Sequence, residues 1–310
     1  MAILPAGIDV LGFGAVAVDD LYYLDGFPRP DEKVLVAASE RQAGGLAGTA
    51  LVAAARLGCR AAYAGTLGED ELSRYILEGL RAEGVSTEWT VHRRGARPYR
   101  SAVIVDMKTN SRTVLSCTDG VLGADPALPE ESLILASKAL LVDHSGMQGM
   151  LRAARIARRA GIPVVGDFER RYAAPFDELL ALTDHLVLPA EFACQLTGAR
   201  EGRAAAEALW DSSRAAVVVT VGAEGCWYLS SEQSGRARHQ PAFRVNTVDT
   251  TGCGDVFHGA YAAGLARGLG LAERVRLATA AAAIKATRTG GQKGIPTRAE
   301  VEAFLASAAG

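Results

Sequence analysis

The chain has 310 residues, of which 49% are hydrophobic and 22% are charged, and its formal net charge is −2. This composition is typical of a folded globular enzyme and excludes a disordered protein, and a chain of this length can bury a large core. The nearly balanced charge argues against nucleic acid or an anionic membrane as a partner, because both attract basic surfaces.

The N-terminal third alternates strand-like apolar runs with helical patterns. Apolar residues recur at helical spacing at Leu72, Ile76, Leu77 and Leu80, and Gly84 is a typical helix stop. The elements expected here are a strand over 8–18, a helix over 48–58, a strand over 61–68 and a helix over 70–84.

Short apolar, β-branched runs continue farther along, separated by helical segments. They are ALLVDH (139–144), IPVVGDF (162–168), DHLVLP (184–189) and AAVVVTVG (215–222). Buried parallel strands have this composition, and the alternation of strand and helix predicts an α/β fold. We expect a doubly wound, mostly parallel sheet with helices on both faces.

Two stretches, 33–42 and 99–117, place apolar runs side by side with no helix between them. The second reads as a hairpin that turns at KTNS. Extra antiparallel strands of this kind predict a small β lid over the crevice at the strand ends, where such sheets bind ligands. We therefore expect one domain over 1–310, with lid segments at about 17–42 and 97–118.

The stretch VDTTGCGDVFHGAYAAG (248–264) places a carboxylate, Asp255, where a glycine-rich turn becomes a helix. A helix N-terminus carries unpaired N–H groups and partial positive charge, which favour anions. One reading is a phosphate-binding turn. The other is that Asp255 merely stabilises the helix, with Thr250 or Thr251 as its cap.

Other glycine signals are ambiguous on their own. Gly44 and Gly45 precede a helix and suit either a ligand or a tight turn. Gly222 and Gly225 follow a buried strand and suit a hairpin turn equally well, and 287–296 reads as a loop. GFGAVA (12–17) is not a dinucleotide site, because no helix follows it directly, and the chain has no P-loop pattern.

The five cysteines, Cys59, Cys117, Cys194, Cys226 and Cys253, are scattered and form no C-x-x-C pair. A disulfide framework or a zinc site is therefore not expected, and free thiols suit a reducing compartment such as the cytoplasm. The N-terminal apolar stretch lacks a basic region and is interrupted by Pro5, Gly7 and Asp9, so it does not read as a signal peptide. No apolar run reaches membrane-spanning length.

Taken in order, these motifs resemble the ribokinase-like (PfkB) carbohydrate kinase family. The resemblance runs from about Asp9 to Pro296, and its most specific part is DTTGCGD (249–255), in which Cys253 stands where the family usually has alanine. Within the family the chain resembles sulfofructose kinase, through RHQPAF (238–243), VDTTG with GDVFHGA (248–260) and GIP (294–296), and SRTVL (111–115) is similar to ketohexokinase.

The resemblance implies that Asp255 is the general base that takes the proton from the sugar hydroxyl as this attacks the γ-phosphate of ATP. An ordinary aspartate has a pKa near 3.9 and would be ionised at neutral pH. The backbone N–H groups of Gly252, Cys253 and Gly254 would form an anion hole for the transferring phosphoryl group.

The family's remaining site positions carry over unevenly. Sugar contacts fall on Asp19, Gly44, Gly45 and Thr49, the last in place of the usual asparagine, and Arg112 is a further substrate or nucleotide contact. Nucleotide contacts fall on Thr220, Gly222, Gly225, Gly252 and Gly254.

The magnesium-linked N-x-x-E motif would lie at 189–192 and is absent, which leaves Glu191 or Glu169 to order Mg²⁺ through water. A monovalent cation near the Asp249–Thr251 loop is also implied. The cofactors expected are thus ATP and Mg²⁺.

The function expected is an ATP-dependent sugar kinase that acts on a primary hydroxyl of a ketose or ketose derivative. The alternatives are sulfofructose kinase proper, a nucleoside kinase of the same family and a catalytically silent sugar-binding regulator. A neutral ketose is preferred over sulfofructose, because only Arg112, Lys108 and the mostly neutral His144 offer positive charge near the sugar. The family further implies a homodimer through the lid.

Overall fold

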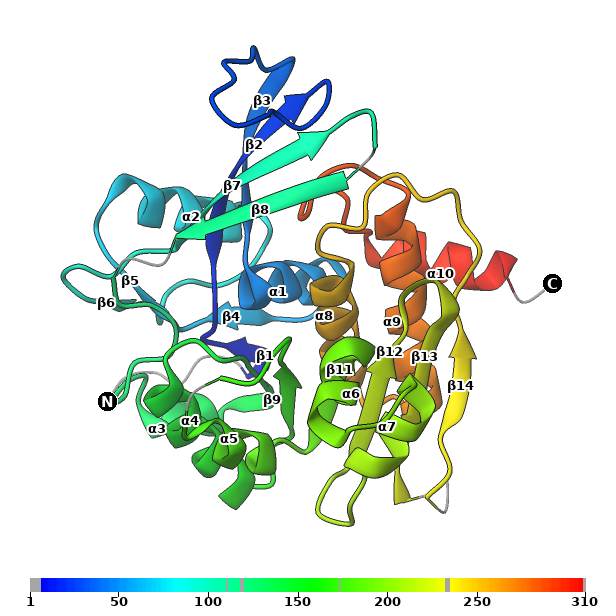
Figure 1. Ribbon diagram of the computed structural model, residues 1–310. Coiled ribbons are helices and arrows are strands. Elements are labelled where there is room, and N and C mark those ends of the chain that lie inside the picture. The colour runs from blue at the N-terminus through cyan, green and yellow to red at the C-terminus, as the bar shows by residue number, and fades with distance from the viewer. Residues whose placement is uncertain (1–6, 110, 118–119, 173, 232–234, 309–310) are drawn as a thin grey trace.

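The computed structural model describes residues 7–109, 111–117, 120–172, 174–231 and 235–308. Its main sheet has eight strands in the order β14-β13-β12-β11-β10-β9-β1-β4 (Figure 1). Their bounds are β1 Ile8–Gly12, β4 Ala61–Tyr63, β9 Ser137–Val142, β10 Val164–Asp167, β11 His185–Pro189, β12 Ala216–Thr220, β13 Gly225–Leu229 and β14 Arg238–Pro241. The six strands from β12 to β4 are parallel, and β13 pairs in antiparallel fashion with both of its neighbours, β12 and β14. This confirms the predicted mostly parallel sheet.

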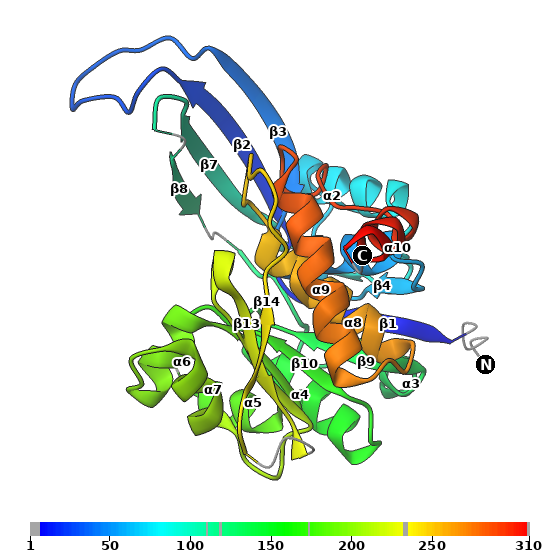
Figure 2. The ribbon, with the colours of Figure 1, turned by 90° about the vertical axis from the view of Figure 1, so that its right-hand side faces the viewer.

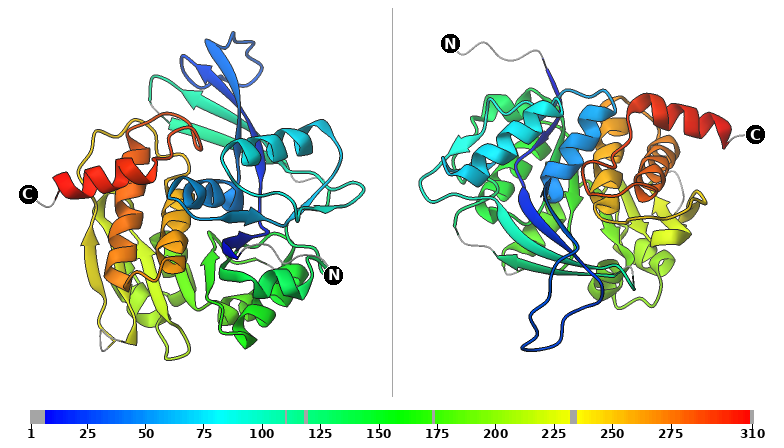
Figure 3. Two further views of the ribbon diagram at one scale, coloured as in Figure 1. Left: turned by 180° about the vertical axis from the view of Figure 1, so that it is seen from behind. Right: turned by 90° about the horizontal axis from the view of Figure 1, so that it is seen from above.

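Helices cover both faces of this sheet (Figures 1 and 3). Helices α1 (Leu46–Arg56), α8 (Cys253–Ala266) and α9 (Leu271–Ala286) cover one face, with α2 (Glu71–Ala82) and α10 (Arg298–Ser307) packed beside them. The other face is covered by α3 (Glu131–Leu135), α4 (Met147–Arg159), α5 (Phe176–Leu182), α6 (Ala190–Thr197) and α7 (Gly202–Leu209). Across the described part of the chain, no helix combines the length and apolar character that a bilayer crossing requires.

Residues alternate between two hydrophobic cores along each central strand. In β11, Val187 belongs to the core beneath α1, α8 and α9, while Leu186 and Leu188 belong to the core beneath α3–α7. Both faces of a parallel sheet must be buried in this way, which is why these strands read as continuous apolar runs.

The helix predicted over 70–84 is confirmed as α2. The Asp70 side chain caps it by accepting hydrogen bonds from the backbone N–H groups of Leu72 (3.0 Å) and Ser73 (3.2 Å). The apolar stripe of Ile76, Leu77 and Leu80 is buried, as its spacing predicts.

The first predicted strand, 8–18, is two strands that belong to different sheets. Strand β1 ends at Gly12, and β2 (Ala17–Leu24) begins after a bend. In this bend the Ala15 N–H donates to Asp143 Oδ2 (2.6 Å), and a Cβ at Gly14 would lie 2.0 Å from that oxygen. The predicted 61–68 strand likewise divides into β4 and β5 (Thr66–Leu67), and β5 pairs with β6 (Val91–His92).

The lid is a separate sheet of four strands in the order β3-β2-β7-β8, which projects from the body of the molecule (Figure 2). The lid strands are β2, β3 (Ala38–Gly44), β7 (Tyr99–Asp106) and β8 (Ser111–Cys117). The antiparallel pairing of β7 with β8 confirms the hairpin, although Asn110 of its turn lies outside the described residues. The strand expected over 33–42 starts only at Ala38.

Candidate active site

The glycine-rich turn leads directly into α8, which begins at Cys253. Gly252 is the N-cap residue with φ 74°, a conformation that glycine adopts without strain, and no side chain caps the helix. The alternative reading with Thr250 or Thr251 as cap is therefore wrong. The Gly254 N–H lies in the first helical turn, before the first group that can bond within the helix, and so is suited to an anion. The Cys253 N–H, by contrast, donates to the Thr250 carbonyl at 3.2 Å.

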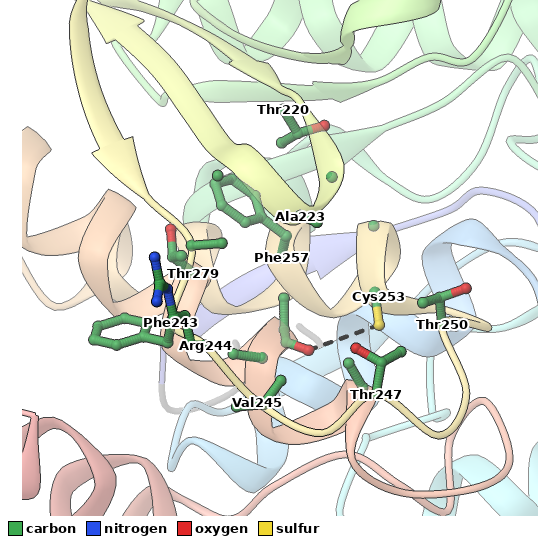
Figure 4. Close-up of a pocket in the computed structure, with 17 residues that line it drawn as sticks. Thr220, Ala223, Phe243, Arg244, Val245, Thr247, Thr250, Cys253, Phe257 and Thr279 are labelled. Carbon is green, nitrogen blue, oxygen red and sulfur yellow. Dashed lines mark hydrogen bonds between the residues drawn. The ribbon is translucent and has the colours of Figure 1, made fainter.

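The thiol of Cys253 faces α9 rather than the strand ends. Its Sγ lies 3.6 Å from the Ala282 carbonyl oxygen, and burial raises the pKa of the thiol (Figure 4). A protonated, partly buried thiol that faces a neighbouring helix is a packing group. Cys253 therefore contributes to the site through its backbone.

A cavity of about 440 Å³ lies between the β12–β13 turn and the start of α8. Five residues predicted for the site line it, namely Thr220, Gly222, Gly225, Cys253 and Gly254. The hairpin-turn reading is confirmed, because Gly222–Glu224 forms a 3₁₀ turn within a β12–β13 hairpin. Gly222 also lines the cavity, so the nucleotide contact stays a prediction.

Apolar side chains form most of the remaining lining of this cavity. Phe243 and Phe257 line the cavity together with Ala223 and Val245 (Figure 4). An apolar slot with a few polar groups suits a flat heterocyclic base. The sequence reading missed the two phenylalanines, since one follows an edge strand and the other lies on a helix whose face is otherwise core.

On the lid side, Asp19 of β2 and Gly44 of β3 are in contact. A Cβ at Gly44 would lie 2.4 Å from Asp19 Oδ2, so only glycine leaves this carboxylate in place. Burial raises the pKa of Asp19, and a hydrogen bond from Ser101 of β7 opposes the shift. Gly45, with φ 88°, is the N-cap of α1.

Thr49 joins this lid side to the glycine turn. Its side chain is 2% exposed, and its Cγ2 would be 3.4 Å from a Cβ at Gly252. The predicted sugar residues and the predicted anion hole therefore meet at one place in the fold.

Asp255 belongs to a group of carboxylates at the carboxyl ends of the parallel strands. Burial, with the negative charges of Asp167 and Glu169, raises the pKa of Asp255 well above its ordinary value. Burial also raises the pKa of Asp167, whose Oδ2 accepts no hydrogen bond. The expectation of an ordinary Asp255 pKa is thus corrected, because a carboxylate near like charges is harder to ionise.

His258, one turn after Asp255, anchors this end of α8 to the sheet. Its Nδ1 lies 2.8 Å from the Gly254 carbonyl oxygen and 3.4 Å from Asp167 Oδ2, and its Nε2 lies 2.9 Å from the Val187 carbonyl oxygen. The sequence reading did not single out His258, because a lone histidine on an apolar helix gives no signal of its partners.

A group of rings lies at the end of β9. Tyr99 Oη is 3.2 Å from His144 Nε2, and the His144 ring stacks on Tyr172 with centroids 4.0 Å apart. Arg170 lies over the Tyr172 ring at 5.3 Å. Burial lowers the pKa of His144, so the imidazole is neutral. The sequence reading found His144 alone and missed the aromatic group and Arg170.

The two cations proposed for the lid are engaged elsewhere. Lys108 pairs with Asp25 at 3.3 Å, and Arg112 contacts Asp249 (3.4 Å) and the Thr251 hydroxyl in the loop before the glycine turn. Arg112 thus lies beside the glycine turn rather than beside Asp19.

The acidic candidates for Mg²⁺, Glu191 at the start of α6 and Glu169 after β10, are both exposed. Within the described ranges, no three acidic, histidine or cysteine side chains lie close enough together to hold a metal by themselves. In the Asp249–Thr251 loop, where the resemblance implies a monovalent cation, the ammonium group of Lys285 contacts the backbone carbonyl and carboxylate oxygens of Asp249.

Comparisons with known proteins agree on one family. Residues 9–298 match the model of the pfkB family carbohydrate kinases. A ribokinase from Haemophilus influenzae is 30% identical, over 94% of this chain and 96% of its own length. Fructokinase-1 from Oryza sativa is 29% identical, over 96% and 98%. The crystal structure of a ribokinase from Thermotoga maritima superposes with a TM-score of 0.81 at 27% identity, covering 96% of this chain and 99% of that one.

Proposed function

The chain belongs to the pfkB family of carbohydrate kinases, and on that premise we propose that it transfers the γ-phosphate of ATP to a primary hydroxyl of a ketose or ketose derivative. The observation that carries the proposal is the position of Asp255. This carboxylate follows a glycine turn that lines the nucleotide-sized cavity on one side and lies beside Thr49 on the other. A hydroxyl held on the lid side would therefore meet a phosphate held in the cavity beside a base.

Asp255 acts as the general base in this proposal. The raised pKa of Asp255 makes its carboxylate a stronger proton acceptor than an ordinary aspartate, as long as it is ionised. It takes the proton from the hydroxyl as the new O–P bond forms and the bond from the γ-phosphorus to the leaving β-phosphate oxygen breaks. His258 holds the helix turn that carries Asp255.

The glycine turn stabilises the phosphoryl group during transfer. Charge on the equatorial oxygens is met by the backbone N–H groups of Gly252 and Gly254 and by the positive end of the α8 dipole. The Cys253 N–H joins them once it leaves the Thr250 carbonyl. Such donors cost no reorganisation when they are already in place, which is why glycine at these positions favours the reaction.

Magnesium fits the acidic end of the strands. Asp167 has a buried oxygen without a hydrogen-bond partner. Glu169 and Glu191 are exposed, and each follows the end of a strand, β10 and β11 respectively, by two residues. Mg²⁺ prefers oxygen ligands and usually keeps several waters, so these carboxylates would hold it through water together with the phosphates. When bound, the ion neutralises charge on the phosphates.

The charges around the sugar side favour a neutral substrate. Asp19, Asp143 and Glu169 are carboxylates on or near the described strand ends, whereas Arg170 is the cation that lies beside the ring group. A sulfonate carries a permanent charge that these carboxylates repel. We therefore favour fructose-type ketoses over sulfofructose, and Arg170 replaces Arg112 and Lys108 as the residue that would accept an anionic sugar.

A substrate screen tests the proposal. ADP release is measured with ketoses, sulfofructose, ribose and nucleosides at fixed ATP and Mg²⁺, and the product is identified by its phosphorus spectrum. We expect the highest kcat/KM with a ketose. Ribose is the second candidate, because ribokinases are among the relatives. A preference for sulfofructose above about tenfold, or ~1.4 kcal/mol, would overturn the neutral-sugar choice. Turnover with nucleosides alone, or with nothing, would favour the nucleoside kinase or the silent regulator.

We further propose a cytoplasmic homodimer that pairs through the lid. The cysteines are scattered along the chain without a C-x-x-C pair, which suits a reducing compartment. On the outer strand β8, Val114 is 51% and Leu115 is 56% exposed, and an uncovered strand edge of this kind favours pairing. Sedimentation should give a dimer, whereas an active monomer at micromolar concentration would contradict the pairing.

A further inference from the structure

Lys285, in the last turn of α9, is a fully buried lysine beside the glycine turn. Its Nζ donates to the backbone carbonyl oxygens of Asp249 (2.9 Å) and Arg288 (3.3 Å) and lies 3.7 Å from Asp249 Oδ2. These oxygens come from two segments, the loop that precedes α8 and the loop that follows α9. One ammonium group therefore joins the two loops.

Asp249, which faces this ammonium group, organises both loops. Its Oδ1 accepts from the Thr251 N–H (2.8 Å) and hydroxyl (2.6 Å), and its Oδ2 accepts from the Gly290 N–H (2.8 Å). Arg112 of the lid lies 3.4 Å from Oδ1. Thr251 is the residue before Gly252, so the geometry of the anion hole depends on where this carboxylate is held.

Burying an ammonium group is costly, and burial lowers the pKa of Lys285. An apolar residue would fill the same volume without that penalty. The neighbours of Lys285 along α9, Ala283 and Ile284, are buried apolar residues of this ordinary kind. The charge at position 285 therefore calls for a role beyond packing.

We infer that Lys285 is a tethered cation that takes the place of a monovalent metal ion at the Asp249–Thr251 loop, so that this kinase works without added potassium. An ammonium group resembles potassium in charge and size, and here it binds the carbonyl and carboxylate oxygens that such an ion would use. Lys285 is a positioning residue, because it orders the loop that carries the phosphate donors and does not itself touch the substrates. The inference rests on the proposed kinase function for its effect on turnover, but not for its effect on cation binding.

The test compares potassium chloride with N-methylglucamine chloride at equal ionic strength, for the wild type and two variants. In Lys285→Ala the ammonium group is gone and space is left for an ion. In Lys285→Met the charge is gone but the space is filled. The first readout is the thermal midpoint of the protein without substrates, which reports cation binding even if no sugar is turned over. The second is kcat and KM with the sugar identified in the screen.

We expect the wild-type midpoint and kcat to be the same in both salts. Lys285→Ala should be less stable and lose at least about tenfold in kcat with little change in sugar KM, and potassium should restore part of both losses. Lys285→Met should show the kcat loss without rescue. A wild-type protein that potassium activates or stabilises would overturn the inference, as would an alanine variant with unchanged kcat or one that potassium fails to rescue.

Discussion

The contact between Gly44 and Asp19 allows a substitution that disturbs the sugar side without disturbing the fold. In Gly44→Ala the new Cβ would lie 2.4 Å from Asp19 Oδ2 and 3.9 Å from the Ala17 Cβ. The nearer atom is the end of a side chain, which can rotate away. Gly44 has no positive φ, so alanine causes no backbone strain. The carboxylate of Asp19, rather than the strand, must move.

The size of the effect follows from this displacement. To reach an ordinary contact distance from the new Cβ, Asp19 Oδ2 must move by about 1 Å. A shift of this size breaks a hydrogen bond of ordinary length that this oxygen accepts. A hydrogen bond to a charged group contributes about 1.5–3 kcal/mol, so kcat/KM for the sugar should fall by roughly 10- to 150-fold. Because the proposal assigns Asp19 to the sugar and not to the nucleotide, the KM for ATP should stay within about twofold.

Steady-state kinetics with the sugar and with ATP varied in turn measure both effects, and thermal unfolding checks the fold. Gly79→Ala is the matched control, because its Cβ would lie 4.0 Å from the Ala43 Cβ and meet nothing closer. Alanine in α2 should stabilise the helix slightly and leave both KM values unchanged. A Gly44→Ala enzyme with wild-type kcat/KM for the sugar would refute the role of Asp19. A Gly44→Ala enzyme in which kcat/KM falls for ATP and not for the sugar would also refute it.

Three further predictions follow from the same geometry. In the pH profile of kcat/KM, the fall on the acid side should occur above pH 3.9, the ordinary pKa of aspartate, because activity is lost as pH falls through the raised pKa of Asp255. Asp167→Asn should move this fall to lower pH by removing a neighbouring negative charge. A carboxyl group whose pKa is raised in the folded state stabilises the fold below its unfolded-state pKa, and this contribution is lost as pH rises through the folded-state pKa. Asp167→Asn should therefore raise the thermal midpoint at pH 8. A lower midpoint would contradict this. Gly259→Ala would place a Cβ 2.1 Å from the Ala50 carbonyl oxygen of α1, so denaturant titration should show a loss of at least about 1–3 kcal/mol, and an unchanged midpoint would show that α1 and α8 pack less closely.

The order of the main elements was readable from the sequence because local patterns determine it. The 70–84 helix carries its own cap and stripe, and 139–144 and 184–189 are apolar runs that only a buried parallel sheet accommodates. The division of 8–18 was not readable. It depends on the contact of the Ala15 N–H with Asp143, which lies 128 residues away along the chain.

Some residues of the candidate site could likewise be predicted from the sequence, and others could not. Glycines that must adopt a positive φ, such as Gly252, and the aspartate after them gave a local signal. Arg170, His258 and Lys285 gave none, since an exposed arginine, a helical histidine and a helical lysine are ordinary until their partners are known. The partners of His258 and Lys285 come from other segments of the chain. Arg170 lies over Tyr172, two residues on, and only the stacking of Tyr172 on His144 links it to the end of β9.

The measurement that tests the account most directly is the turnover of Asp255→Asn at saturating ATP and sugar. Asparagine keeps the shape of the side chain and removes its ability to accept a proton, so sugar phosphate should form at least about 10²-fold more slowly. Binding of a non-hydrolysable ATP analogue, measured by calorimetry on the same protein, should be retained. A variant that binds the analogue and keeps more than about half of the wild-type kcat would contradict the assignment of Asp255 as the general base.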